Sequence, residues 1–264
     1  MKWSDKLTYK VALVTGASSG IGRACAISLG SQGFKLILVA RRAEKLAALQ
    51  DELKTHTECF CIAEDIRNHS RIEELLGQLP NQFSQIDVLI NNAGLALGLD
   101  TAQNASWSDW EDMININCSG LAFMTHLLIP KMVERNCGHI INIGSIAGTY
   151  PYYGGNVYGA TKAFVEQLTL NLKADLLGTK VRVSNIEPGM VSNSEFSLVR
   201  FGHDQVKANA VYKGIEALKP EDIANCILWI LDQPNHVNIN RVELMPVSQA
   251  PSRTAFHKEV DSSS

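Results

Sequence analysis

Short apolar runs rich in β-branched residues alternate with longer amphipathic stretches along nearly the whole chain. Glycine or polar residues bound each run, which is typical of buried strands. The predicted strands are residues 10–15, 35–40, 58–63, 87–91, 139–144, 181–187 and 242–247. The stretches between them carry apolar residues at helical spacing. The predicted helices are residues 21–32, 43–54, 70–79, 106–135 with a break near Pro130, 158–177 and 221–231.

This alternation predicts an α/β fold in which a doubly wound parallel sheet of about seven strands carries helices on both faces. In such a fold, ligands bind at the carboxyl ends of the strands. A chain of 264 residues, of which 45% are hydrophobic and 19% charged, can bury one large core. We therefore expect a single domain over residues 1–264, with a frayed tail at residues 252–264.

The formal net charge of −3 leaves no excess of basic residues, which excludes nucleic acid and anionic membrane surfaces as partners. The chain starts with charged residues, and no apolar stretch approaches the length of a membrane span, so we expect a cytoplasmic protein. The six cysteines form no Cys-x-x-Cys pair and the seven histidines are scattered. We therefore expect reduced thiols and no metal site.

A glycine-rich turn follows the first predicted strand and leads into the first predicted helix. Its spacing is Gly-x-x-x-Gly-x-Gly, and its members include Gly16, Ser18, Ser19, Gly20, Ile21 and Gly22. Glycines allow the backbone to turn tightly and to approach a pyrophosphate, which then lies against the N–H groups at the helix N-terminus. The turn therefore predicts a dinucleotide site, with an ordinary loop as the alternative.

The second predicted strand runs into Arg41 and Arg42. Enzymes that use NAD usually carry an acidic residue at this point, which binds the ribose 2′-hydroxyl. Here the first carboxylate after the strand is Glu44. Two guanidinium groups suit a 2′-phosphate, so the sequence predicts NADP as the cofactor. The alternative is that both arginines are solvent-exposed residues at the end of the strand and bind no ligand.

Tyr158 and Lys162 are four residues apart, so a helix presents both on one face, and Ser145 precedes Tyr158 by thirteen positions. A free tyrosine, with a pKa of about 10, is a poor base at neutral pH. A lysine ammonium nearby lowers that pKa, and the phenol can then exchange a proton with a substrate while a nicotinamide cofactor exchanges a hydride. We predict redox chemistry on a hydroxyl or carbonyl group. A surface tyrosine and lysine are the alternative.

Several separated motifs resemble the short-chain dehydrogenase/reductase family, and the resemblance covers nearly the whole chain. These motifs are residues 15–22 and 91–94, Asn117, Ser145, Tyr158, Lys162, Pro188 and Gly189. The resemblance implies a Rossmann-type sheet and a catalytic tetrad made of Asn117, Ser145, Tyr158 and Lys162.

The same resemblance implies a role for each motif. Tyr158 would be the acid/base, Ser145 would polarise the substrate oxygen, and Lys162 would bind the nicotinamide ribose and lower the pKa of Tyr158. Asn117 would bend its helix and hold a water that links Lys162 to solvent. The cofactor would also contact Asp65, Ile66, Asn91, Asn92, Ala93, Gly94, Pro188, Gly189, Val191 and Ser194. The alternatives are a helix cap for Asp65 and a bond to its own helix backbone for Asn117.

Within the family, the sequence resembles the NADP-dependent 3-hydroxy acid dehydrogenases. The matching segments are residues 91–98, 132–136, 138–145 and 154–158, with further matches at 195–197, 199–201, 236–240 and 245–247. This resemblance implies oxidation of serine, allo-threonine, 3-hydroxypropionate or a similar acid to its 3-oxo acid or semialdehyde, or the reverse reaction. One alternative is an NADPH-dependent reductase of a 3-oxoacyl thioester or of another ketone or aldehyde. A more distant one is an NADP-binding sensor without turnover.

A short hydroxy acid carries a carboxylate that needs a cation near the reactive carbon. Arg200 is the candidate, because it lies in the weakly patterned stretch 192–219, which we expect to form a substrate lid. Alternatively, Arg200 pairs with a neighbouring acid and holds this lid. The family resemblance also implies a homotetramer, built on helices whose apolar residues cover more than one face.

Overall fold

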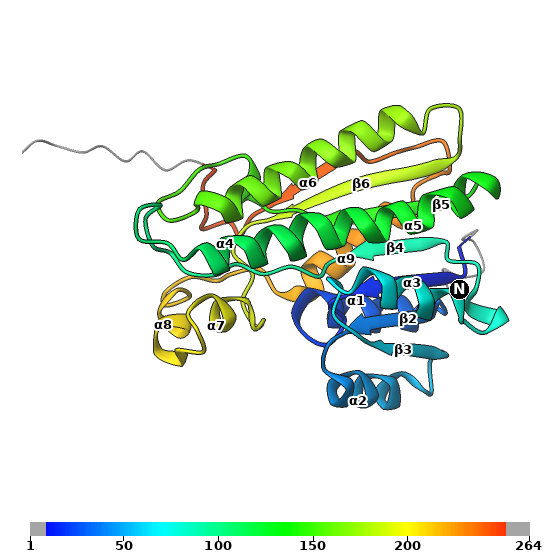
Figure 1. Ribbon diagram of the computed structural model, residues 1–264, viewed down its shortest axis with the longest axis horizontal. Helices are drawn as coiled ribbons and strands as arrows, with labels where there is room; N and C mark the ends of the chain where they lie inside the picture. The colour runs from blue at the N-terminus through cyan, green and yellow to red at the C-terminus, as the bar shows by residue number, and fades with distance from the viewer. Residues whose placement is uncertain (1–8, 252–264) are drawn as a thin grey trace, which may run out of the picture.

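A computed structural model describes residues 9–251, in which seven strands form one sheet. The strands lie in the order β3-β2-β1-β4-β5-β6-β7, and each neighbouring pair is parallel (Figure 1). Their bounds are β1 Val11–Thr15, β2 Lys35–Ala40, β3 Cys59–Ala63, β4 Val88–Asn91, β5 Gly138–Ile143, β6 Val181–Pro188 and β7 Arg241–Leu244. The predicted Rossmann-type parallel sheet is therefore confirmed.

The strand order reverses at the middle of the sheet, where β1 pairs with β2 on one side and with β4 on the other. All residues of β1 and β4 are buried, because a parallel sheet is covered on both faces. The crevice for a dinucleotide in such a sheet lies at this reversal, beyond the carboxyl ends of the strands. The glycine-rich turn follows β1 and Asn92 follows β4, so both lie at the crevice.

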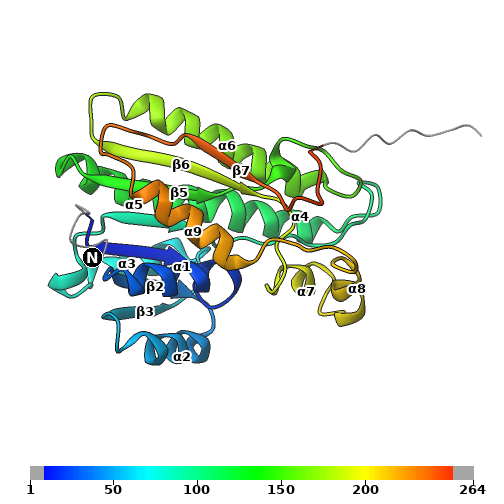
Figure 2. The ribbon, with the colours of Figure 1, turned by 180° about the vertical axis from the view of Figure 1, so that it is seen from behind.

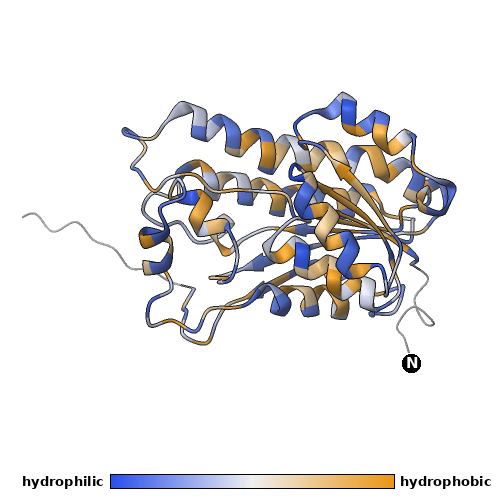
Figure 3. Cartoon of the chain, turned by 90° about the horizontal axis from the view of Figure 1, so that it is seen from below, coloured by the Kyte–Doolittle hydropathy of each residue, from blue (hydrophilic) through white to orange (hydrophobic). Residues whose placement is uncertain are grey.

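Helices cover both faces of the sheet (Figures 1 and 2). One face carries α1 (Gly20–Ser31), α2 (Ala43–Leu53) and α9 (Pro220–Leu231), and the other carries α3 (His69–Gly77), α5 (Leu121–Glu134) and α6 (Asn156–Asp175). Leu29 of α1 belongs to the first core and Met124 of α5 to the second. Figure 3 shows the hydrophobic strands enclosed between these helices.

The predicted helix break near Pro130 is wrong. Pro130 lies inside α5, which continues to Glu134. The irregularity lies earlier, where a π-helical segment, η3 (Asn115–Gly120), joins α4 (Trp107–Ile114) to α5. The hydrogen bonds of a π-helix span five residues, one more than those of an α-helix, and such segments often occur at functional sites.

The helix that α4, η3 and α5 form together, Trp107–Glu134, is 28 residues long and is apolar enough to cross a membrane by length and composition. This corrects the expectation that no apolar stretch approaches that length. Met124, Leu128 and Met132 of this helix are buried in the second core. Packing against the sheet therefore accounts for much of its apolar character.

The stretch predicted to form a lid contains two short helices, α7 (Phe196–Arg200) and α8 (Gln205–Ala210). They lie beside the end of the sheet, away from the helices of both faces (Figure 1). Movement of this segment stays a prediction. Two short 3-10 turns, η2 (Asn81–Phe83) and η4 (Ile146–Gly148), complete the described elements. The predicted tail at 252–264 lies outside the described residues.

Candidate active site

The glycine-rich turn has the shape of a phosphate cradle. Gly16 and Gly20 have φ angles of 65° and 52°, which side chains disfavour. A Cβ added at Gly22 would lie 2.3 Å from the carbonyl oxygen of Gly16. Ser19 precedes α1 without capping it through its side chain. The N-terminal N–H groups of α1 can therefore face a bound anion, and the residues fit a dinucleotide pyrophosphate.

The segment 91–94 is bonded directly to this turn. The side-chain amide of Asn92 donates to the carbonyl oxygens of Thr15 and Gly16 at 2.9 and 3.2 Å, and the N–H of Ala93 donates to the Thr15 hydroxyl at 2.9 Å. Asn91 differs, because its buried amide donates to Thr125 and Asn142 inside the core. The side chain of Asn91 is therefore used inside the core, and only its backbone can face a cofactor.

Arg42 bonds to the same turn. One of its terminal nitrogens lies 3.0 Å from Oγ of Ser18 and 3.1 Å from Oγ of Ser19. The other lies 2.7 Å from a carboxylate oxygen of Glu195. Arg41 is more exposed, and its nearest described carboxylate, Asp65, lies 4.0 Å away. The geometry thus favours a binding role for Arg42 over that of an arginine exposed at a sheet edge.

Asp65 does not cap a helix, since α3 begins at His69 after the N-cap residue Asn68. Its carboxylate instead accepts hydrogen bonds from the side chain and the N–H of Arg67. Partial burial raises the pKa of Asp65, but the Arg67 bonds outweigh burial and hold that pKa below its usual value. The Ile66 side chain is buried in the second core, so only its backbone can face an adenine ring.

The four tetrad residues come from three separate segments. Tyr158 and Lys162 lie on α6 and are buried, Asn117 lies in η3, and Ser145 follows β5. Nζ of Lys162 lies 6.0 Å from the centre of the Tyr158 ring, and Ser145 forms a side-chain hydrogen bond with Tyr158. A Cβ added at Gly94 would lie 3.1 Å from Oδ1 of Asn117 and 3.6 Å from Nζ of Lys162. The fold therefore gathers the tetrad at the loop after β4.

Asn117 ties that loop to the helices. Its amide oxygen accepts from the N–H of Leu95 at 2.9 Å, and its amide nitrogen donates to the carbonyl oxygen of Leu95 at 2.8 Å and to the hydroxyl of Thr161 at 3.1 Å. These partners lie outside η3, so the alternative that Asn117 bonds its own helix backbone is wrong. Asn117 lies in the π-helical segment, and the bend expected of it stays a prediction.

Burial dominates the ionisation of the two α6 residues. It raises the pKa of Tyr158 to about 12, against the opposing effects of the Ser145 hydrogen bond and the Arg200 charge. Burial also lowers the pKa of Lys162 to about 8. The expected lowering of the Tyr158 pKa by Lys162 is not found among these effects. Nζ of Lys162 instead donates to the carbonyl oxygen of Ile143 at 2.8 Å.

Arg200 lies at the same site. Its guanidinium carbon is 5.3, 5.5 and 5.9 Å from the ring centres of Tyr152, Tyr158 and Phe196. It donates to the Tyr152 hydroxyl and, at 3.2 Å, to the carbonyl oxygen of Gly98. No described carboxylate forms an ion pair with Arg200. Among the described residues Arg200 thus has no acidic partner, but its bonds to Gly98 and Tyr152 hold α7 against the loop that contains Gly98.

The segment after β6 covers the glycine-rich turn. The N–H of Gly189, directly after Pro188, donates to the carbonyl oxygen of Leu244 at 2.7 Å, and the carbonyl of Val191 accepts from the hydroxyl of Tyr212. A Cβ added at Gly20 would lie 3.1 Å from that of Ser194. The segment thus reaches the glycine-rich turn, and the contacts of Pro188, Gly189, Val191 and Ser194 with the cofactor stay a prediction.

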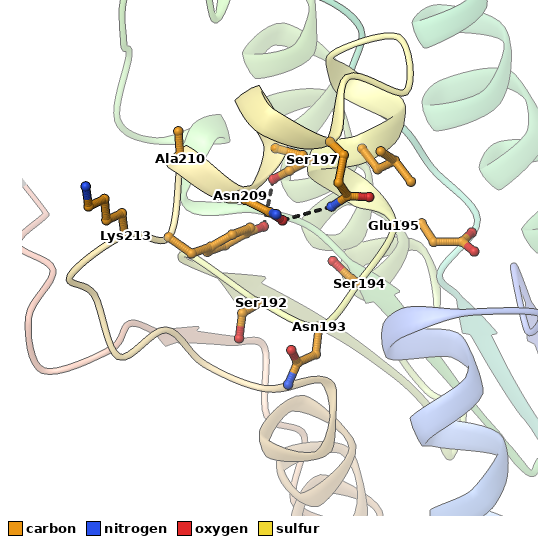
Figure 4. A pocket seen from close by; sticks show the side chains of 12 residues that line it. Ser192, Asn193, Ser194, Glu195, Ser197, Asn209, Ala210 and Lys213 are labelled. Carbon is orange, nitrogen blue, oxygen red and sulfur yellow. Dashed lines mark hydrogen bonds between the residues drawn. The ribbon is translucent and has the colours of Figure 1, made fainter.

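Sequence reasoning did not predict the contact between Lys45 and Glu195. Both line a cavity of about 530 Å³ beside Ser18, Ser19 and Gly20, and Nζ of Lys45 lies 2.5 Å from Oε1 of Glu195. Lys45 follows Arg42 by three positions at the start of α2. Residues at this spacing lie on the same face of a helix, so the sequence could have indicated that Lys45 lies near Arg42. A larger cavity of about 710 Å³ lies against α7 and α8 and contains no tetrad residue (Figure 4).

Within residues 9–251, no group of three or more His, Cys, Asp or Glu side chains is arranged to hold a metal ion. The described cysteines are all free thiols.

Comparisons with known proteins show the family of the chain. A family model described as short chain dehydrogenase matches residues 10–199. The chain is 53% identical over 248 residues to the NADP-dependent 3-hydroxy acid dehydrogenase YdfG of Salmonella typhi, which covers 94% of this chain and 99% of that protein. It is 46% identical over 244 residues to the sulfoacetaldehyde reductase of Chromohalobacter salexigens, which covers 92% and 96%.

Among solved structures, the closed form of serine dehydrogenase complexed with NADP⁺ matches with a TM-score of 0.91 at 51% identity, covering 94% of this chain and all of that one. Fold, site and comparisons lead to the same assignment. The chain belongs to the short-chain dehydrogenases and is an NADP-dependent oxidoreductase.

Proposed function

We propose that the protein interconverts a short 3-hydroxy acid, such as serine, allo-threonine or 3-hydroxypropionate, and its 3-oxo acid or semialdehyde. Arg200 is the observation that carries this proposal. It places a guanidinium 5.5 Å from the ring centre of the acid/base candidate Tyr158, and no described carboxylate neutralises it. A cation beside the reactive centre suits a substrate whose carboxylate lies close to its hydroxyl or carbonyl carbon.

The residues around Tyr158 divide the chemistry among them. In reduction, the phenol of Tyr158 donates its proton to the substrate carbonyl oxygen, and the hydroxyl of Ser145 donates a hydrogen bond to the same oxygen. NADPH, when bound, supplies the hydride. In oxidation, Tyr158 takes the proton of the substrate hydroxyl. Burial raises the pKa of Tyr158 to about 12, so the phenol is protonated at neutral pH, which is the form that donates a proton in the reductive direction.

Lys162 and Arg200 supply the positive charge of the site. Ser18, Ser19, Arg41 and Arg42 would hold the phosphates of the cofactor, and Lys162 would hold its nicotinamide ribose. Arg200 would bind the substrate carboxylate, while its bonds to Gly98 and Tyr152 fix the guanidinium in place. Placement of both reacting groups before reaction is a large source of rate enhancement in enzymes.

A second candidate substrate is a short aldehyde with another anionic group. It is favoured by the relative named sulfoacetaldehyde reductase, at 46% identity. A sulfonate, like a carboxylate, suits the Arg200 cation. A 3-oxoacyl thioester or an uncharged ketone would not use this cation, and a sensor without turnover would not need the buried Tyr158 and Lys162 pair.

Nicotinamide absorbance during turnover tests the proposal. The purified protein is given NADP⁺ or NAD⁺ with L-serine, L-allo-threonine, 3-hydroxypropionate or 3-hydroxyisobutyrate, and NADPH with sulfoacetaldehyde or an uncharged aldehyde of the same size. We expect the protein to turn over the anionic compounds. Tyr158→Phe should abolish this turnover. Tyr153→Phe is the control and should leave it unchanged, because Tyr153 is 77% exposed. Turnover of the uncharged aldehyde alone would contradict the proposal.

A further inference from the structure

The Glu195 carboxylate lies between two cations at the edge of the phosphate cradle. One of its oxygens is 2.7 Å from Nη1 of Arg42, and the other is 2.5 Å from Nζ of Lys45. The second terminal nitrogen of Arg42 bonds to the hydroxyls of Ser18 and Ser19 in the glycine-rich turn. Figure 4 shows Glu195 at the margin of the larger cavity beside α7 and α8, on the side that faces the N-terminal ribbon drawn in blue.

This contact joins parts of the chain that are 150 residues apart. Lys45 lies in the first turn of α2 on the cofactor side, whereas Glu195 immediately precedes α7 in the segment predicted to form the lid. Partial burial raises the pKa of Glu195, but the hydrogen bonds from Lys45 and Arg42 outweigh burial and keep that pKa below its usual value. Glu195 is therefore an anion at neutral pH.

A carboxylate held by these two side chains makes the contacts that a phosphate would make. The bonds of Arg42 to Ser18 and Ser19 place its guanidinium where the 2′-phosphate of an NADP adenosine is expected, next to the turn that cradles the pyrophosphate. A second anion that approached the same cations would be repelled by Glu195, since like charges at short range disfavour each other.

We propose that Glu195 is an internal anion that occupies the 2′-phosphate site of the free protein, and that Lys45 is a third cation of that site beside Arg41 and Arg42. The incoming 2′-phosphate displaces the Glu195 carboxylate and takes over its contacts with Arg42 and Lys45. This inference rests on the proposed assignment of Arg42 to the 2′-phosphate. It adds a competing residue and a binding residue that determine the affinity for NADP.

The displacement also has a consequence for the segment that carries Glu195. Its neighbour Ser194 lies against the glycine-rich turn, with its Cβ 3.1 Å from the Cβ position of Gly20. Release of Glu195 removes two ion pairs that hold this segment to α2 and to the end of β2. A nucleotide without the 2′-phosphate offers no anion to replace Glu195, so the exchange is specific to NADP.

Isothermal titration of the full-length protein with 2′,5′-ADP and with 5′-AMP tests the proposal without substrate or turnover. Partly exposed ion pairs are individually weak, so we expect Glu195→Gln to lower the Kd for 2′,5′-ADP by about three- to tenfold and to change the Kd for 5′-AMP by less than about twofold. Lys45→Gln is expected to raise the Kd for 2′,5′-ADP by a similar factor and to spare 5′-AMP.

Glu52→Gln is the matched control, because Glu52 lines the same cavity but pairs with Arg23. It is expected to leave both dissociation constants within about twofold of wild type. Weaker binding of 2′,5′-ADP by Glu195→Gln would overturn the proposal, since Glu195 would then orient Arg42 and Lys45 for the phosphate. Equal tightening of 2′,5′-ADP and 5′-AMP would overturn it as well, because the effect would not depend on the phosphate. Neither result depends on which substrate the enzyme uses.

Discussion

Nζ of Lys162 donates a hydrogen bond to the carbonyl oxygen of Ile143 at 2.8 Å, across the space between α6 and the end of β5. Lys162 is 7% exposed, and burial lowers its pKa to about 8. The ammonium group is therefore held at the centre of the site at a cost to the folded state, because an unfolded lysine has a pKa near 10.5.

Lys162→Met is expected to stabilise the free protein at pH 7 and to reduce turnover at least about a hundredfold. The lowered pKa corresponds to about 3 kcal/mol of lost stability while the ammonium is charged, and loss of the bond to Ile143 offsets about 1 kcal/mol of the gain. The difference in unfolding free energy between Lys162→Met and wild type should shrink between pH 8 and pH 10.5, where Lys162 is neutral in the folded protein. Urea unfolding across this range measures it, and equal stability of both proteins at pH 7 would contradict the argument. Lys173→Met on the same helix is the control.

Arg200→Met is expected to lower kcat/KM for 3-hydroxy acids about a hundredfold, mainly through KM, because the substrate carboxylate loses its cation. An uncharged carbonyl substrate of the same size should be reduced at the wild-type rate. Steady-state kinetics with both substrates measures the difference. Arg200→Lys should recover part of the loss, since it keeps the charge but not the planar guanidinium.

Tyr152→Phe separates a substrate role of Arg200 from a purely structural one. This variant removes the hydroxyl that accepts a hydrogen bond from Arg200 but leaves the cation in place. If Arg200 binds the substrate, Tyr152→Phe should affect KM far less than Arg200→Met does. If Arg200 only holds α7 against the loop that contains Gly98, both variants should raise KM for acids and for uncharged substrates to a similar extent.

The sheet and the position of the site could be predicted from the sequence, because both depend on local patterns. The strands are continuous apolar runs, and the glycine-rich turn needs glycines at Gly16 and Gly20, whose φ angles are positive. The π-helical segment could not be predicted, since residues 115–120 have no distinctive composition and Pro130 was the more visible irregularity. Asn117 within this segment bonds to Leu95, 22 residues away in the sequence, and local patterns do not record such a contact.

Two features of the site depend on long-range packing that no local pattern records. The bond between Lys45 and Glu195 joins residues 150 positions apart. The raised pKa of Tyr158 follows from the burial of its ring in the folded protein, whereas the sequence showed only the lysine four residues away. In both cases the residue types were visible, but the distances and the exclusion of water were not.

Glu187→Gln is expected to reduce the loss of stability on going from pH 5 to pH 8. The side chain of Glu187 is 1% exposed and lies 2.7 Å from Arg241, and burial, followed by the charge of Glu166, raises its pKa to about 7. A carboxyl with a raised pKa favours the folded state while it is protonated, so that contribution, about 3 kcal/mol, is lost as the pH rises from about 4.5 through 7.

Chemical unfolding of wild type and variant at several pH values checks this sign. Glu243→Gln is the matched control, because its carboxylate lies 3.5 Å from the same Arg241 but is 29% exposed. It should leave the pH dependence nearly unchanged. Parallel stability curves for Glu187→Gln and wild type would show that Glu187 is ionised in the folded protein throughout this range.

We expect a homotetramer in solution, with contacts along α6. Phe164, Leu170 and Leu177 of the α6 region are 41%, 43% and 74% exposed, so this region leaves apolar side chains in water that other copies of the chain could cover. Light scattering after gel filtration should give four times the chain mass of 28.9 kDa. Leu170→Asp should shift this mass to a smaller species, because a charge would be buried in the contact. Val206→Asp, at an 80% exposed residue of α8, should not shift it. A monomer in the wild type would contradict the tetramer and leave the chemistry at Tyr158 untouched.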